Sequence, residues 1–60
     1  MTPERIKKIR LAAGLTQEAL AAKVGVTAST VYRWEKGRKK PQGPARKMLK
    51  QLEGGKGHAD

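Results

Sequence analysis

Three glycines divide most of this 60-residue chain into segments too short for a long helix. Gly14, Gly25 and Gly37 lie at nearly regular intervals, and each follows a segment whose apolar residues are spaced three and four apart. A glycine just past such a segment readily takes the left-handed conformation that ends a helix. The glycines therefore predict short helices packed together rather than one long helix.

Hydroxyl side chains stand where the expected helices begin. Thr2 precedes Pro3, the residue type favoured at a first helical position, and Thr16 and Thr27 precede the next two apolar segments. Each hydroxyl can accept a hydrogen bond from a free N–H of the first helical turn. The third helix is expected to run over residues 28–36.

A fourth helix is expected from Pro44 to about Glu53, after a basic loop over residues 38–43. Residues at helical spacing predict the inward faces of the four helices. In chain order these residues are Ile6, Ile9 and Ala13; Leu20, Ala21 and Val24; Val31 and Trp34; and Met48, Leu49 and Leu52. The fold class is all-α, a compact bundle of four short helices. Residues 1–53 form one domain, and residues 54–60, which have nothing to bury, form a disordered tail.

Positive charge limits the partners of the chain. Fourteen Lys and Arg against five acidic residues give a net charge of +9, which favours polyanions such as nucleic acid or an anionic membrane. With only Tyr32 and Trp34 as aromatic residues, a single-strand binder built on base stacking is disfavoured. Double-stranded RNA also fits poorly, because its deep, narrow major groove does not admit a helix.

The chain has no segment that predicts export or membrane insertion. Its longest nearly uncharged stretch, residues 24–32, is far shorter than the ~20 residues of a spanning helix. The N-terminus lacks the apolar run of a secretory signal. The absence of cysteine excludes disulfides and thiolate zinc sites and fits a reducing cytoplasm. We expect a cytoplasmic protein that associates with the nucleoid through DNA.

Catalysis has little support in the sequence. The only histidine, His58, lies in the expected tail, and no paired carboxylates or glycine-rich phosphate loop accompany it. We expect no enzyme activity, no metal and no cofactor. A membrane-active peptide would need one long amphipathic helix, which the glycines interrupt. Cooperative thermal unfolding in plain buffer would separate a folded bundle from such a peptide.

Four short motifs occur together along the centre of the chain. They are GLTQ (residues 14–17), LA (20–21), VGV (24–26) and WEKG (34–37). As a set with these spacings, they closely resemble the Cro/C1, or Xre-type, helix-turn-helix family, from about Ile6 to Leu52. The resemblance implies a lambda-repressor-like fold. It also implies a transcription regulator, acting as a repressor, that binds double-stranded DNA with its third helix in the major groove.

The resemblance also implies which side chains face the bases. With Val31 inward, the 100° helical step turns another face of the third helix outward. The expected base contacts are Ala28, Ser29, Tyr32 and Arg33. Arg33 is expected to carry most of the readout, because a guanidinium pairs in a bidentate way with guanine. The alternatives are a solvated charge at Arg33, and a phosphate contact or simple surface cover at Tyr32.

Phosphate contacts are expected around this face. The residues are Gln17, Thr27, Lys36, Arg38, Lys39 and Lys40, with at least two of the last four reaching the DNA backbone. The alternative for Gln17 is a plain surface residue, and for the charge run a solvated face. Arg10 and Glu35 stand at family positions that pair with each other, so we expect a structural ion pair between the first and third helices.

The family usually has a fifth helix, often used for dimerisation, and this chain ends after the fourth. We therefore expect a homodimer that forms only on DNA. The segment WEKGRKKPQGPARKMLKQL also resembles the C-terminal half of helix-turn-helix antitoxins. The alternative function is an antitoxin that represses its own operon and binds a toxin protein.

Overall fold

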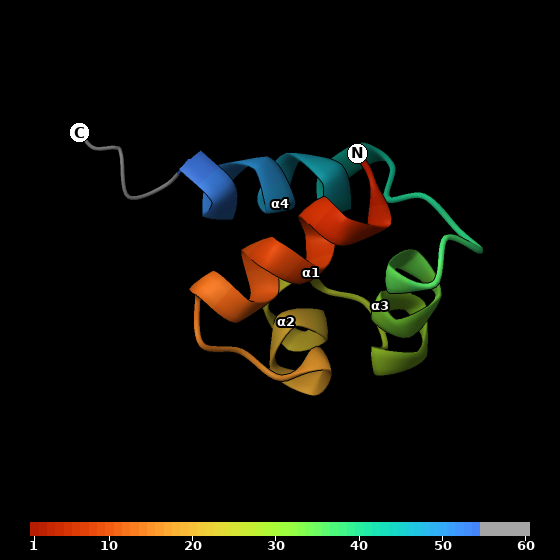
Figure 1. The fold of residues 1–60 in the computed structure, drawn as a ribbon, viewed down its shortest axis with the longest axis horizontal. Helices are drawn as coiled ribbons and strands as arrows, with labels where there is room; N and C mark the ends of the chain where they lie inside the picture. The colour runs from red at the N-terminus through yellow and green to blue at the C-terminus, as the bar shows by residue number, and fades with distance from the viewer. Residues whose placement is uncertain (55–60) are drawn as a thin grey trace.

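Four helices make up the computed structural model, which describes residues 1–54. They are α1 (Pro3–Ala12), α2 (Gln17–Val24), α3 (Ala28–Glu35) and α4 (Gly43–Gly54). In Figure 1, α4 runs above α1, and α2 and α3 lie below it in this view; α4 packs against both α1 and α2. The described residues contain no strand, so the predicted all-α bundle of four short helices is confirmed. None of these helices is long and apolar enough to cross a bilayer.

Threonine side chains cap the first three helices, as the sequence predicts. The Thr16 hydroxyl accepts a hydrogen bond of 3.0 Å from the backbone N–H of Ala19. The Thr27 hydroxyl accepts from the N–H of Thr30 at 3.3 Å, and Thr2 caps α1 in the same way. Each cap satisfies an N–H that has no acceptor within its helix, and its removal typically costs ~1 kcal/mol.

The turn between α2 and α3 depends on Gly25. Its φ of +83° lies in the left-handed region, as predicted, and a side chain there would be strained. The N–H groups of Gly25 and Val26 both donate to the carbonyl of Ala21, at 2.8 and 2.9 Å. This closes α2 and sends the chain directly into the cap of α3. The two helices therefore pack on each other with only a short connection.

The core is built from the predicted stripes, with one exception. The buried side chains are Ile6, Ile9, Leu20, Ala21, Val24, Val31, Trp34 and Leu49. Met48 and Leu52 are half-buried and pack against this cluster. The prediction that Ala13 continues the inward stripe of α1 is wrong, because the helix ends at Ala12 and Ala13 is its exposed C-cap.

Helix boundaries near α4 differ from the prediction by one residue. α4 begins at Gly43 instead of Pro44, and it ends at Gly54 instead of Glu53. Such shifts are within the usual uncertainty of helix ends. Gly54 therefore belongs to the helix and not to the expected tail; residues 55–60, with His58, lie outside the described residues. Before α4, Pro41 is buried, which holds the otherwise exposed basic loop against the bundle.

Candidate nucleic-acid interface

An open hollow of about 450 Å³ lies between the start of α2 and the outer face of α3. It is lined by Gln17, Ala28, Ser29, Tyr32, Arg33 and Arg38. The structure thus brings the four expected base-contact residues together with two of the expected phosphate contacts. Gln17 comes from α2, and Arg38 comes from the loop after α3, so only the folded chain joins them.

The residues around this hollow differ in exposure. Ser29 and Arg33 are exposed on successive turns of α3, and Tyr32 keeps 44% of its surface exposed. Ala28 is half-buried and packs against the core, so it offers little more than a methyl group. The Nζ of Lys36 lies 5.5 Å from the centre of the Tyr32 ring, a cation–π distance. This contact places the Lys36 charge beside the exposed face of α3.

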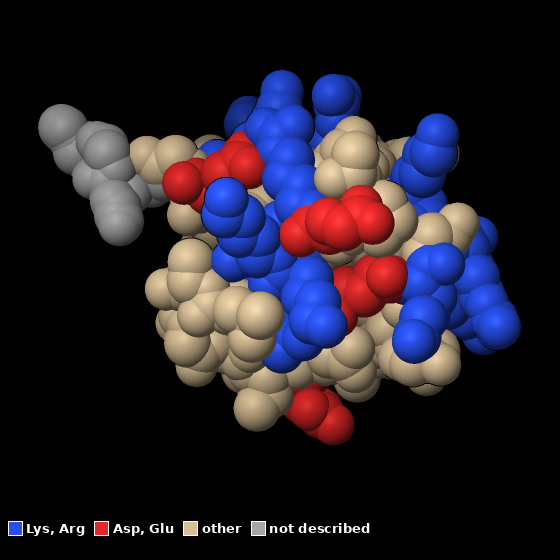
Figure 2. Space-filling model, viewed as in Figure 1, with Lys and Arg blue, Asp and Glu red and all other residues tan. Residues whose placement is uncertain are grey.

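The basic loop divides between two sides of α3. Arg38 lines the hollow just described, whereas Lys39 and Lys40 line a second hollow beside Thr30 and Trp34. Thr30 and Trp34 are four residues apart on a different face of α3 from Ser29 and Arg33. The buried indole N–H of Trp34 has no hydrogen-bond partner among residues 1–54. Positive charge therefore flanks α3 on both sides, and Figure 2 shows Lys and Arg gathered at this end of the molecule.

An ion pair joins α1 to α3. The Arg10 Nε donates to Glu35 Oε2 at 2.7 Å, and its Nη2 donates to Glu35 Oε1 at 3.2 Å. Arg10 Nη1 also donates to the carbonyl of Leu15 at 3.1 Å. The two side chains keep only 13% and 7% of their surface exposed. This pair ties α1, the α1–α2 turn and the end of α3 together.

Gln17 takes part in the same network. Its Nε2 donates to Glu35 Oε1 at 3.2 Å, so Glu35 holds the first residue of α2 beside α3. Burial by itself raises the pKa of Glu35. Hydrogen bonds from Arg10 and Gln17, and the charges of Arg10 and Lys7, outweigh it and bring the pKa below its ordinary value. Glu35 is therefore an anion in the folded protein, and it orients the amide of Gln17.

Two side-chain contacts between helices could not be predicted from the sequence. The Gln17–Glu35 hydrogen bond joins residues 18 positions apart, and it gives Gln17 a structural partner beside its expected phosphate contact. Arg5 of α1 makes a bidentate pair with Glu53 of α4, 48 positions away, through hydrogen bonds of 2.6 and 2.5 Å. Neither spacing follows a helical repeat, so only the packing of the helices reveals these pairs.

Metal binding is not supported within residues 1–54, where no three His, Cys, Asp or Glu side chains lie close enough to hold an ion. The chemistry of the interface is that of hydrogen-bond donors and fixed positive charge. Guanidinium, ammonium, hydroxyl and amide groups suit phosphate oxygens and base edges.

Comparison with known proteins agrees with this geometry. The helix-turn-helix family model matches residues 6–53, which is more than half of the chain. No curated protein and no solved structure matches the chain. The matched residues include α2, the turn at Gly25 and α3, as well as all the residues that line the first hollow. The chain therefore belongs to the Cro/C1-type helix-turn-helix family of DNA-binding proteins.

Proposed function

We propose that this protein is a sequence-specific transcriptional repressor that reads the major groove of double-stranded DNA with α3. The observation that carries the proposal is the first hollow, where side chains from α2, α3 and the following loop meet on one open surface. The major groove of B-DNA is ~12 Å wide and admits one helix. α3 supplies its exposed face to the bases, and the flanking elements supply contacts to the phosphates.

Arg33 is the principal base-reading residue of this proposal. It is exposed one turn after Ser29, and a bidentate contact to guanine O6 and N7 contributes ~1–3 kcal/mol of discrimination. Ser29 can donate or accept and discriminates weakly, while the half-buried methyl of Ala28 suits a thymine methyl. The exposed Tyr32 ring, with Lys36 beside it, completes the contact face.

Phosphates are bound on both flanks of α3 in this arrangement. Gln17 is the first residue of α2, where free backbone N–H groups and the helix dipole favour an anion. Arg38 stands on the same side as Gln17, and Lys39 and Lys40 stand on the other. Thr27 lies at the start of α3, where its hydroxyl also caps the helix. These contacts fix the register of α3 in the groove without reading sequence.

Selection of bound sites from a random duplex library at physiological salt tests the proposal. We expect a short motif containing guanine to be enriched, repeated with inverted symmetry if two copies bind. Salt-sensitive binding without any enriched motif would contradict sequence-specific reading, because charge alone gives affinity without sequence preference. A reporter gene placed behind the recovered site would then separate repression from activation.

The antitoxin alternative stays a prediction. No contact among the described residues favours a toxin partner over DNA binding alone. A toxin gene beside the gene for this protein would be the observation that favours it.

A further inference from the structure

One hydrogen bond links the ion pair between α1 and α3 to the surface proposed to face DNA. Gln17 lines the first hollow and is half-buried, and its Nε2 donates to Glu35 Oε1 at 3.2 Å. The Glu35 side chain is almost out of contact with water. Gln17 therefore reaches from a buried anion to the open surface between the start of α2 and the outer face of α3.

The charge of Glu35 decides which end of the Gln17 amide faces inward. A carboxylate only accepts hydrogen bonds, so it binds the nitrogen of the amide and repels the oxygen. Within residues 1–54, this is the one hydrogen bond that the Gln17 side chain makes. The same nitrogen carries a second N–H, which is left for a ligand. A phosphate oxygen, which also only accepts, suits this second N–H.

Arg10 holds both the carboxylate and the chain just before α2. Its guanidinium donates to the two Glu35 oxygens at 2.7 and 3.2 Å, and its Nη1 donates to the carbonyl of Leu15 at 3.1 Å. Leu15 precedes Gln17 by two residues. Arg10 therefore anchors the acceptor of the Gln17 amide and the backbone from which the Gln17 side chain extends.

The Arg10 charge also lets an anion lie close to a phosphate. A phosphate bound by the second N–H of Gln17 would lie within about 6 Å of the Glu35 carboxylate, which is two hydrogen-bond lengths. An unpaired carboxylate at this distance would repel it, whereas the Arg10–Glu35 pair carries no net charge. An ion pair therefore suits this position where a lone glutamate would not.

We propose that Glu35, held by Arg10, is a positioning residue for DNA binding, which turns the Gln17 amide so that its second N–H meets a DNA phosphate. The ion pair then contributes to affinity as well as to stability. The placement of DNA on the first hollow rests on the proposed function. An amide already fixed in the free protein loses little freedom on binding, and ordering a free side chain otherwise weakens association by about 2- to 10-fold.

A double-mutant cycle in DNA affinity tests this role. The ion pair is replaced in two ways, by Arg10→Met/Glu35→Met and by Arg10→Met/Glu35→Gln, and Gln17→Ala is added to the wild type and to each variant. In the wild type, Gln17→Ala should weaken binding of every duplex by about tenfold, as expected for a hydrogen bond to a charged group. This cost should fall by about 2- to 10-fold in the Glu35→Met background. It should return with Glu35→Gln, because glutamine again offers an oxygen acceptor to the Gln17 amide.

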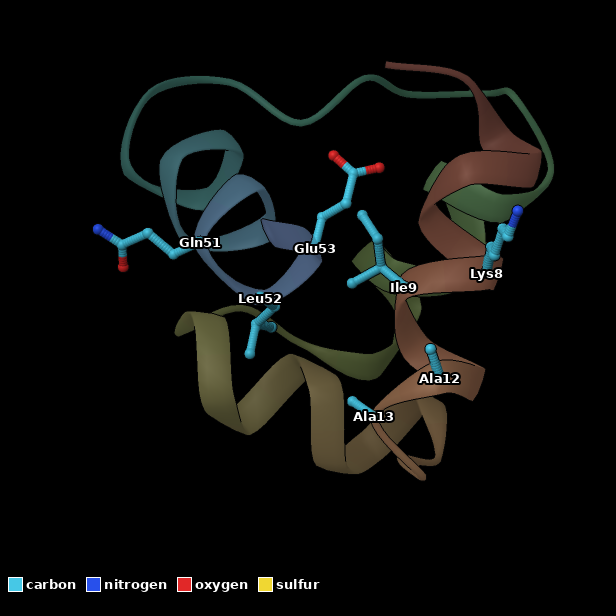
Figure 3. A pocket seen from close by; sticks show the side chains of 7 residues that line it. All are labelled: Lys8, Ile9, Ala12, Ala13, Gln51, Leu52 and Glu53. Carbon is cyan, nitrogen blue, oxygen red and sulfur yellow. The ribbon is translucent and has the colours of Figure 1, made fainter. Parts of the chain in front are cut away.

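Two controls separate positioning from stability. Lys39→Ala/Lys40→Ala removes charge from the second hollow, which Gln17 does not line, and its cost should be the same in all three backgrounds. Gln51→Ala repeats the chemical change of Gln17→Ala on α4. Gln51 is exposed beside a groove of about 750 Å³ between α1 and α4 and points away from it (Figure 3), and its substitution should leave affinity unchanged. Each affinity is corrected for the folded fraction, which urea unfolding gives.

Amide NMR spectra of the wild type provide a test that needs no substitution in the core. On addition of a duplex, one of the two side-chain N–H protons of Gln17 should shift much more than the other, because the other stays on Glu35. Two protons that shift equally, or not at all, would overturn the proposal.

The affinities also distinguish this proposal from the proposed function. An equal cost of Gln17→Ala in all three backgrounds, no cost in the wild type, or a cost that Glu35→Gln does not restore would overturn the positioning role. So would a cost of the two lysine changes that varies with the background in the same way, because the pair would then act on the whole end of α3. Coupling on random duplexes without any preferred site would refute only the repressor function. A preferred site together with equal costs would refute only the positioning role.

Discussion

Replacing Arg10 with methionine should strand the carboxylate of Glu35. The substitution keeps much of the side-chain volume but removes both hydrogen bonds that Arg10 donates to Glu35, at 2.7 and 3.2 Å. Glu35 would keep only the bond from Gln17 Nε2 while its side chain is 7% exposed. An anion left with one hydrogen bond and little water is strongly destabilised relative to the unfolded chain.

The expected loss of unfolding free energy is about 3 kcal/mol. Breaking a fully buried pair costs ~3–5 kcal/mol, and the 13% exposure of Arg10 lets water reach part of the site, which favours the lower end. A 60-residue domain has a total stability of only ~3–9 kcal/mol. The loss corresponds to a fall in Tm of at least about 12 °C and leaves the variant close to unfolding at room temperature.

Urea unfolding followed by fluorescence measures this directly. Trp34 is the only tryptophan and is 2% exposed, so its emission reports exposure of the core. Arg5→Met is the control, because it breaks the exposed Arg5–Glu53 pair and should cost far less. The double variant Arg10→Met/Glu35→Met should regain most of the loss, since it leaves no stranded charge. A cost below about 1 kcal/mol for Arg10→Met would refute the reasoning, because that is the value of a solvated pair.

The pH dependence of the unfolding free energy independently tests the direction in which the pKa of Glu35 changes. In the wild type the pKa of Glu35 is below its unfolded value of 4.5, so its contribution to stability is complete above pH 4.5 and lost as the pH falls through the folded pKa. In Arg10→Met, burial acts with little opposition and raises the pKa of Glu35. The deficit of this variant against the wild type should therefore begin to shrink above pH 4.5, as the pH falls through the raised pKa of the variant, and should shrink further below pH 4.5, where the wild type loses its own stabilisation.

Three further changes test the interface and the turn. Arg33→Ala should reduce affinity for the selected site by about 10- to 100-fold and affinity for random duplexes much less; equal losses would show an electrostatic anchor only. Replacing Lys39 and Lys40 with alanine should weaken all duplexes alike and flatten the plot of log K against log salt by ~2, and an unchanged slope would place them outside the interface. Gly25→Ala should cost about 1–2 kcal/mol in urea unfolding, because its φ is +83° and the added methyl meets nothing within 4 Å. Gly54→Ala, without positive φ, is the control and should cost nothing; equal midpoints for both variants would contradict backbone strain.

Local signals explain why the helices were predicted well. A threonine cap and a glycine stop act within one helical turn, so Thr16 and Gly25 specify the ends of α2 from their neighbours alone. The prediction that Ala13 belongs to the inward face of α1 was wrong, because the spacing of apolar residues does not say where a helix ends. The burial of Pro41 could not be predicted from the sequence, since burial of a loop residue depends on which distant residues pack over it.

The sequence alone determined the four helices, their inward faces, the family and the face of α3 that points outward. These follow from interactions between residues a few positions apart, and from motifs that survive in linear order. Only the tertiary structure decided that Gln17 and Arg38 share one hollow, that Lys39 and Lys40 lie on the other flank of α3, and that residues of α1 and α4 border one groove. Such juxtapositions depend on the angles at which helices pack, and those angles are set by how all the core side chains fit together.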